Sequence, residues 1–109
     1  RGGLSMGNPW RGEVSLVIDG QRHAARLTLG ALAELEAALE ADSLLALVER
    51  FEENRFSSRD VLALLTAGLR GGGAEIDEAT LAQARIEGGP MAAARAAAEL
   101  LARAFTVPE

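Results

Sequence analysis

The sequence predicts a small α+β domain in which an N-terminal two-stranded antiparallel β-hairpin packs on a bundle of about five short α-helices. Three observations support this fold class. Apolar residues alternate over a short stretch that ends at an Asp-Gly pair, leucines recur at helical spacing over much of the remaining chain, and glycine, proline or N-cap residues separate the helical stretches. A chain of 109 residues has the size of one domain and can bury a core without disulfides.

The hairpin is expected at about residues 13–27. Its first strand has the two-residue apolar period of a half-buried strand, carried by Val14, Leu16 and Ile18. Asp19-Gly20 tolerates the positive φ angles of a two-residue type I′ turn, after which the chain returns as a second strand. This turn pairs Leu16 with His23 and leaves one continuous apolar face. Because an isolated hairpin is only marginally stable in water, helices must cover that face.

The helices are expected at about residues 29–41, 43–53, 58–70, 78–87 and 90–105. The third is predicted to be central, because apolar residues occupy more than half of its circumference. Ser57 with Asp60 three residues later forms a capping-box pattern at its start, and Gly71-Gly72-Gly73 is expected to end it. Asp77 is expected to cap the fourth helix, and Pro90 to be the first residue of the fifth.

Composition argues against several classes of function. Eleven basic and sixteen acidic residues give a formal charge of −5, and an acidic surface repels the phosphates of nucleic acid. No apolar run approaches the roughly 20 residues of a membrane-spanning helix. With no cysteine and one histidine, His23, the usual ligands of a metal site are missing. We therefore expect a cytoplasmic protein without metal or cofactor, whose partners are neither nucleic acid nor membrane.

No catalytic arrangement is predicted either. His23 lies in the middle of a strand, with no nucleophile and orienting acid at a recognisable spacing. Gly71-Gly72-Gly73 follows a helix rather than a strand, and the chain has no lysine for a P-loop. We expect no enzyme activity.

One local pattern suggests a different class of function. Asp42-Ser43-Leu44, in an acidic helical chain, resembles the site at which acyl carrier proteins receive a phosphopantetheine arm, here on Ser43. The simpler interpretation is that Asp42 or Ser43 caps the second helix. Carrier proteins are four-helix domains without a leading hairpin, so the predicted order of elements favours the cap.

The first residues are expected to lie outside the fold. Residues 1–6 show no hydrophobic period, and we expect them to form a disordered tail in which residues 1–5 derive from a vector and Met6 is the natural start. The single domain then comprises residues 7–109.

Several segments together give the chain a family resemblance. They are residues 7–13 (GNPWRGE), 27–36 (LTLGALAELE), 56–61 (FSSRDV) and 88–90 (GGP). In their order and spacing the chain resembles the small tail assembly protein of alphaproteobacterial gene transfer agents, a phage-type family. The likeness covers nearly the whole chain after Met6, and none of the segments is a catalytic motif.

The resemblance implies a tail assembly chaperone in the bacterial host cell. Such chaperones coat the tape-measure protein until tail-tube subunits polymerise around it, so the implied partners are the tape-measure protein and other tail proteins, with self-association left open. The family has also been described as tail tube protein. The alternative is therefore a tail component that stays in the virion-like particle, although a tube subunit is expected to contain more strand.

Large apolar residues at the ends of elements, or away from the buried stripes, are the candidates for a protein-binding surface. They are Trp10, Leu45, Phe56, Met91 and Phe105. Burial in the core is the simpler explanation for each. An alanine substitution that weakens tape-measure binding without lowering the melting temperature would identify a contact residue.

Overall fold

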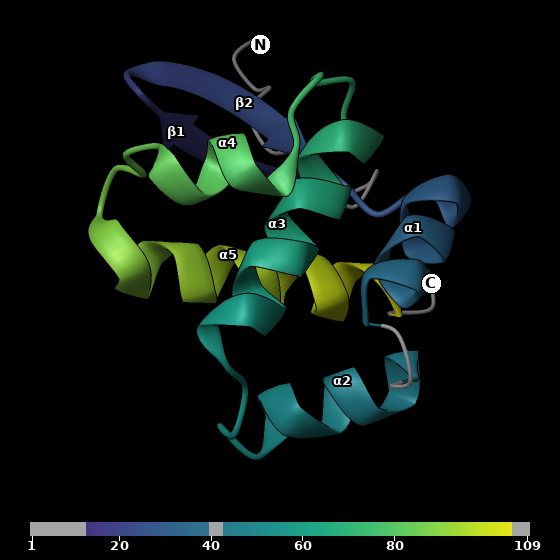
Figure 1. Ribbon diagram of the computed structural model, residues 1–109. Coiled ribbons are helices and arrows are strands. Elements are labelled where there is room, and N and C mark those ends of the chain that lie inside the picture. Colours follow the sequence, from purple (N-terminus) through teal and green to yellow (C-terminus); the bar gives the residue numbers. More distant parts are fainter. Residues whose placement is uncertain (1–12, 40–42, 106–109) are drawn as a thin grey trace, which may run out of the picture.

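The computed structural model describes residues 13–39 and 43–105 and has the predicted α+β architecture. Its elements are β1 (Val14–Ile18), β2 (Gln21–Ala25), α1 (Leu29–Leu39), α2 (Leu44–Glu52), α3 (Ser58–Gly71), α4 (Glu78–Gln83) and α5 (Gly89–Ala104). Figure 1 shows α3 crossing the centre of the molecule, with the hairpin at one end of it and α2 at the other. The expected tail at residues 1–6 lies outside the described residues.

The hairpin has the predicted register. Val14 pairs with Ala25 and Leu16 with His23, and the turn residues Asp19 and Gly20 have φ angles of 51° and 82°. The three inward side chains of β1 are each at most 6% exposed. The amide of Arg26, just after β2, donates to the carbonyl of Gly68 at 2.8 Å, which attaches the hairpin to α3.

Helix α3 is the centre of the core, as predicted. Every residue from 63 to 69 is buried, and α3 packs against α1, α4, α5 and β2. The largest fully buried side chains are Leu35, Leu47, Leu64, Leu65, Leu69 and Leu100. The predicted capping box is also present, because Ser57 Oγ accepts from the amide of Asp60 at 3.1 Å and Asp60 Oδ2 accepts from the amide of Ser57 at 2.9 Å.

The end of α3 corrects the interpretation of its glycines. Gly71 is still helical and Gly72 is the C-cap. A Cβ on Gly71 would lie 2.1 Å from the carbonyl oxygen of Arg26, and one on Gly72 would lie 2.0 Å from that of Ala24. These two glycines are therefore required because α3 touches the backbone at β2. Only the next residue, Gly73, has a positive φ, of 105°.

Helix α4 is shorter than predicted, and the expectation of a helix to residue 87 was wrong. It ends at Gln83, and Ala84 is extended with a ψ of 159°. The segment that follows, residues 85–87, lies along β1. The amide of Asp19 donates a hydrogen bond to the carbonyl oxygen of Arg85 at 2.8 Å. The amide of Glu87 donates one to the carbonyl oxygen of Val17 at 2.9 Å. Because these bonds require extended backbone, the helix cannot continue.

The remaining helices differ from prediction by a residue or two. Helix α5 begins at Gly89 and not at Pro90, and the positive φ angles of Gly88 (89°) and Gly89 (74°) turn the chain into the helix. Helix α2 begins one residue after its cap, Ser43. Helix α1 is described to Leu39, and the end predicted for it at residue 41 lies outside the described residues.

Candidate protein-binding surface

The structure places the described candidate contact residues on α2, at the two ends of α5 and in the loop before α3, and not in one continuous patch. Leu45 on α2 is 67% exposed, Met91 near the start of α5 is 72% exposed, and Phe105 at its end is 51% exposed. Phe56 is half-buried and stacks on the ring of Phe51, with centroids 4.4 Å apart. Trp10 lies outside the described residues. Leu45, Met91 and Phe105 thus remain available for contacts, whereas Phe56 joins α2 to the loop before α3.

One further large apolar residue is exposed that the sequence pattern did not predict. Leu29, the first residue of α1, is 84% exposed. Leu29 is three residues before Leu32, which is the spacing of the apolar stripe that faces the core. The sequence pattern therefore predicts that Leu29 is buried. Its position at the very start of α1 is what leaves it in solvent.

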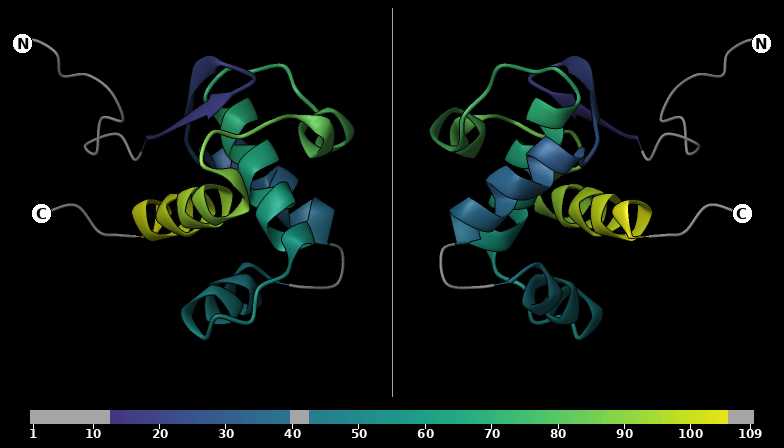
Figure 2. Two further views of the ribbon diagram at one scale, coloured as in Figure 1. Left: turned by 90° about the vertical axis from the view of Figure 1, so that its left-hand side faces the viewer. Right: turned by 90° about the vertical axis from the view of Figure 1, so that its right-hand side faces the viewer.

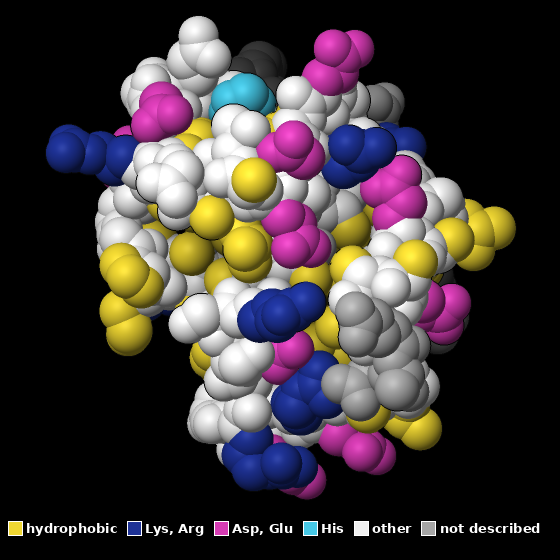
Figure 3. Space-filling view, viewed as in Figure 1, with side chains coloured by type: hydrophobic (Ala, Val, Ile, Leu, Met, Phe, Trp, Pro, Cys, Tyr) yellow, Lys and Arg dark blue, Asp and Glu magenta, His cyan; other side chains and the backbone are white. Residues whose placement is uncertain are grey.

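An apolar groove lies between α3, α4 and the start of α5. Its volume is about 470 Å³. It is lined by Ser58, Val61, Leu62, Leu65, Leu81, Ala82, Ala84, Arg85, Ile86, Gly89, Pro90 and Ala93. Figure 3 shows hydrophobic side chains gathered on this face, over α4, α3 and the first turns of α5. The sequence pattern did not predict that these residues form a surface.

The groove exists because residues 85–87 are bonded to β1. The bridge between Ile18 and Ile86 carries the chain away from α4 along the hairpin before it turns into α5. Helices α4 and α5 are thereby held at opposite sides of α3, and the apolar side chains between them are only partly covered.

The lining of the groove is graded from buried to half-exposed. Leu65, Leu81 and Ala93 form a buried floor, while Val61 and Ile86 are half-buried at the rim. A concave apolar surface with an accessible rim suits the apolar face of an amphipathic helix. Contiguous apolar patches on a folded surface commonly mark sites of interaction.

Comparison with known proteins identifies the family. Residues 11–107 match the family described as "Phage tail tube protein, GTA-gp10". The chain belongs to this family. No curated protein and no solved structure matches it. The family assignment confirms the predicted relation to the tails of gene transfer agents and phages, and its description favours a tail component over an assembly chaperone.

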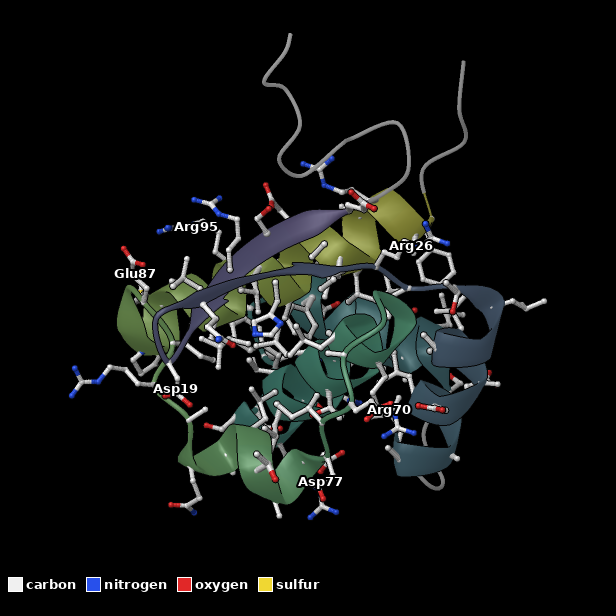
Figure 4. The ribbon with its side chains drawn as sticks, turned by 90° about the horizontal axis from the view of Figure 1, so that it is seen from above. Asp19, Arg26, Arg70, Asp77, Glu87 and Arg95 are labelled. Carbon is white, nitrogen blue, oxygen red and sulfur yellow. The ribbon has the colours of Figure 1, made fainter. Side chains whose placement is uncertain are left out.

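A polar depression lies on another side of this GTA-family protein, between α1, the end of α3 and the loop before α4. Its volume is about 580 Å³. Arg70 Nε donates to Glu34 Oε1 at 3.0 Å and Arg70 Nη1 to the carbonyl of Ile76 at 3.2 Å. Asp77 caps α4, and the hydrogen bond from the Thr80 amide lowers its pKa. Figure 4 shows Arg70 and Asp77 on the same side of the molecule.

These polar contacts hold elements together and form no recognisable reaction centre. In residues 13–39 and 43–105, no group of three His, Cys, Asp or Glu side chains could hold a metal ion. His23 is half-buried in β2, opposite Leu16. Ser43 Oγ accepts from the amide of Ala46 at 3.1 Å, which is the predicted cap. Across the same described ranges, no helix has the length and apolar character to cross a membrane.

Proposed function

We propose that this GTA-family protein is a tail assembly chaperone that holds an amphipathic helix of the tape-measure protein in the groove between α3, α4 and α5. The observation that carries the proposal is the groove itself. It combines a buried apolar floor, which belongs to the core cluster of the described residues, with a half-buried rim. Such a groove accommodates apolar side chains at helical spacing of about three to four residues, which is the pattern of an amphipathic partner helix.

The charge of the chain supports the same role. A formal charge of −5 gives the domain an acidic surface, and like charges on neighbouring copies oppose aggregation. A long apolar tape-measure helix coated with such domains would stay in solution in the host cytoplasm until the tube assembles. The groove supplies attachment, and the acidic surface supplies solubility.

A tail component retained in the particle is the second candidate, and the description of the family favours it. The low proportion of β-strand argues against this second candidate. The described chain contains two strands of five residues each, whereas a tube subunit is expected to be richer in strand. Probing purified particles for the chain distinguishes the two roles. A tube component is present in many copies, and a chaperone is absent.

A groove-blocking substitution tests the chaperone role directly. Ala82 is exposed on α4 and lines the groove, whereas Ala79 is exposed on the same helix outside the lining. When co-expressed with the tape-measure protein, the unaltered chain and Ala79→Glu should retain it in a pull-down. Ala82→Glu should reduce retention by about tenfold or more, because a carboxylate would be desolvated in the groove. Melting temperatures of the two variants should agree.

Three results would count against the proposal. Equal retention by Ala82→Glu and Ala79→Glu would exclude the groove as the binding site. Failure of the unaltered chain to bind, together with abundant copies in purified particles, would assign it to the tail itself. Added mass on Ser43 after incubation with a phosphopantetheinyl transferase would assign it to the carrier class.

A further inference from the structure

One side of α5 is exposed along its whole length. Its residues follow each other at intervals of four, three, four and three, which places them on one face of the helix. They are Met91, Arg95, Ala98, Ala102 and Phe105, all exposed, and are called the α5 seam below. Figure 2 shows α5 running from the middle of the molecule to its outer edge in both views. This face is separate from the groove, whose lining on α5 ends at Ala93.

The two large apolar residues of the α5 seam lie at equal distances from Ala98. Met91 lies seven residues before it and Phe105 seven residues after it. If two α5 helices run antiparallel and cross at Ala98, Met91 of one copy faces the partner's Phe105, and both large apolar side chains become covered. Alanine at the crossing point lets the two backbones approach closely. A twofold interface requires this kind of self-complementary surface.

One charged residue of the seam, Arg95, and one beside it, Glu99, have opposite signs. Among the described residues Arg95 makes no ion pair, and Glu99 has a single long contact of 3.9 Å with Arg103. In the antiparallel arrangement, Arg95 and the partner's Glu99 lie on the same flank and differ by two residues in height, about 3 Å along the axis. Each copy therefore gains one opposite-charge contact. A parallel arrangement would instead place Arg95 level with the partner's Arg95.

We propose that a second copy of this chain docks on the α5 seam to form an antiparallel, twofold-symmetric dimer. Figure 4 shows Arg95 projecting from the outside of the molecule, where a second copy can reach it. The inference is independent of the tape-measure proposal, because it uses a different face. A single pair of 16-residue helices buries less than the roughly 1,600 Å² of a standard interface. The association should therefore depend on concentration.

Cysteine cross-linking tests the geometry, because the chain has no cysteine of its own. In the proposed dimer the two copies of residue 98 lie beside the twofold axis, within reach of a disulfide. Ala98→Cys should therefore form a covalent dimer under mild oxidation about tenfold faster than Ala79→Cys. Ala79 is exposed on α4, away from the seam, and reports random collision.

Charge reversal tests the pairing. In light scattering, the average mass of the unaltered protein should rise from 11.4 kDa toward twice that mass as its concentration is increased. Arg95→Glu should shift this rise to at least about tenfold higher concentration, and Arg95→Glu with Glu99→Arg should restore it. The dimer would be overturned if the unaltered protein kept the monomer mass at all concentrations and Ala98→Cys cross-linked no faster than Ala79→Cys. It would also be overturned by a monomer in which Arg95→Glu weakens tape-measure retention, since the seam would then bind that partner.

Discussion

Asp60 shows how a single buried carboxylate is kept charged. It is 7% exposed, and burial by itself would raise its pKa. Two guanidinium hydrogen bonds from Arg50, each 2.9 Å long, and one from the amide of Ser57 outweigh that effect and lower the pKa. The same carboxylate therefore caps α3 and anchors α2.

Asp60→Asn should destabilise the domain by about 1–3 kcal/mol at pH 7, because Arg50 loses its charged acceptor. The pKa of Asp60 is lowered in the folded state, so its contribution is present above the unfolded pKa of about 3.9 and is lost as the pH falls through the folded value. The stability difference between the two proteins, measured by urea unfolding, should hold from pH 7 to 5 and shrink below about pH 4.

The exposed pair of Arg55 with Glu53 provides the control for that measurement. Glu53→Gln should change stability by less than about 1 kcal/mol, because solvent screens the pair. A pH-independent difference for Asp60→Asn would show that the loss comes from packing or capping and not from the carboxylate charge.

Two glycines should respond to alanine in opposite directions. Gly71→Ala should cost about 1–3 kcal/mol or more, because the new Cβ would lie 2.1 Å from a backbone oxygen that belongs to the hairpin connection. Gly30→Ala in α1 should stabilise by about 0.4–1 kcal/mol, because its nearest neighbour would be 3.9 Å away. Urea unfolding of the two variants would test both predictions: the midpoint should fall for Gly71→Ala and rise for Gly30→Ala, with unchanged m-values. A neutral Gly71→Ala would mean that the end of α3 moves freely.

At the scale of elements, the sequence predicts the structure correctly where the determining residues are close together in the chain. The hairpin register followed from Asp19-Gly20, and the start of α3 followed from Ser57 and Asp60. The end of α4 was mispredicted because it is set by hydrogen bonds between residues 85–87 and β1, which are far apart in sequence. The groove depends on that pairing, so it had no local signature. The exposed candidates on α2 and α5 could be named, but their separation in space could not.

The contact between the hairpin turn and residue 85 gives an element-scale prediction. Asp19 Oδ1 accepts from the amide of Arg85 at 2.9 Å while its own backbone has a φ of 51°. Asp19→Ala should cost about 2 kcal/mol, because alanine lacks the acceptor and disfavours positive φ. Asp19→Asn keeps both properties and should stay within about 0.5 kcal/mol. Thermal unfolding and faster hydrogen exchange at the Arg85 amide in Asp19→Ala would check this.

At the scale of the whole molecule, the hairpin is part of the core and not an addition to a helical bundle. Its inward residues belong to the same buried cluster as the leucines of α3 and α5. Residues 85–87, which shape the groove, are hydrogen-bonded to the backbone of β1 and its turn. The fold should therefore unfold as one unit, since neither the sheet nor the helices can bury their apolar faces alone.

Leu16→Ala tests this unity. Leu16 is 6% exposed beneath the helices, and its truncation should cost about 2–5 kcal/mol through lost burial and a residual cavity. The unfolding midpoint followed by helical circular dichroism should fall together with the protection of strand amides in hydrogen exchange. Ser15→Ala, on the opposite face of β1, should leave both nearly unchanged. If the helices of Leu16→Ala melted at the unaltered temperature while the strand amides exchanged freely, the five helices would be a domain by themselves. That outcome would contradict the view that the groove depends on the hairpin, because residues 85–87, which shape the groove, are paired with β1.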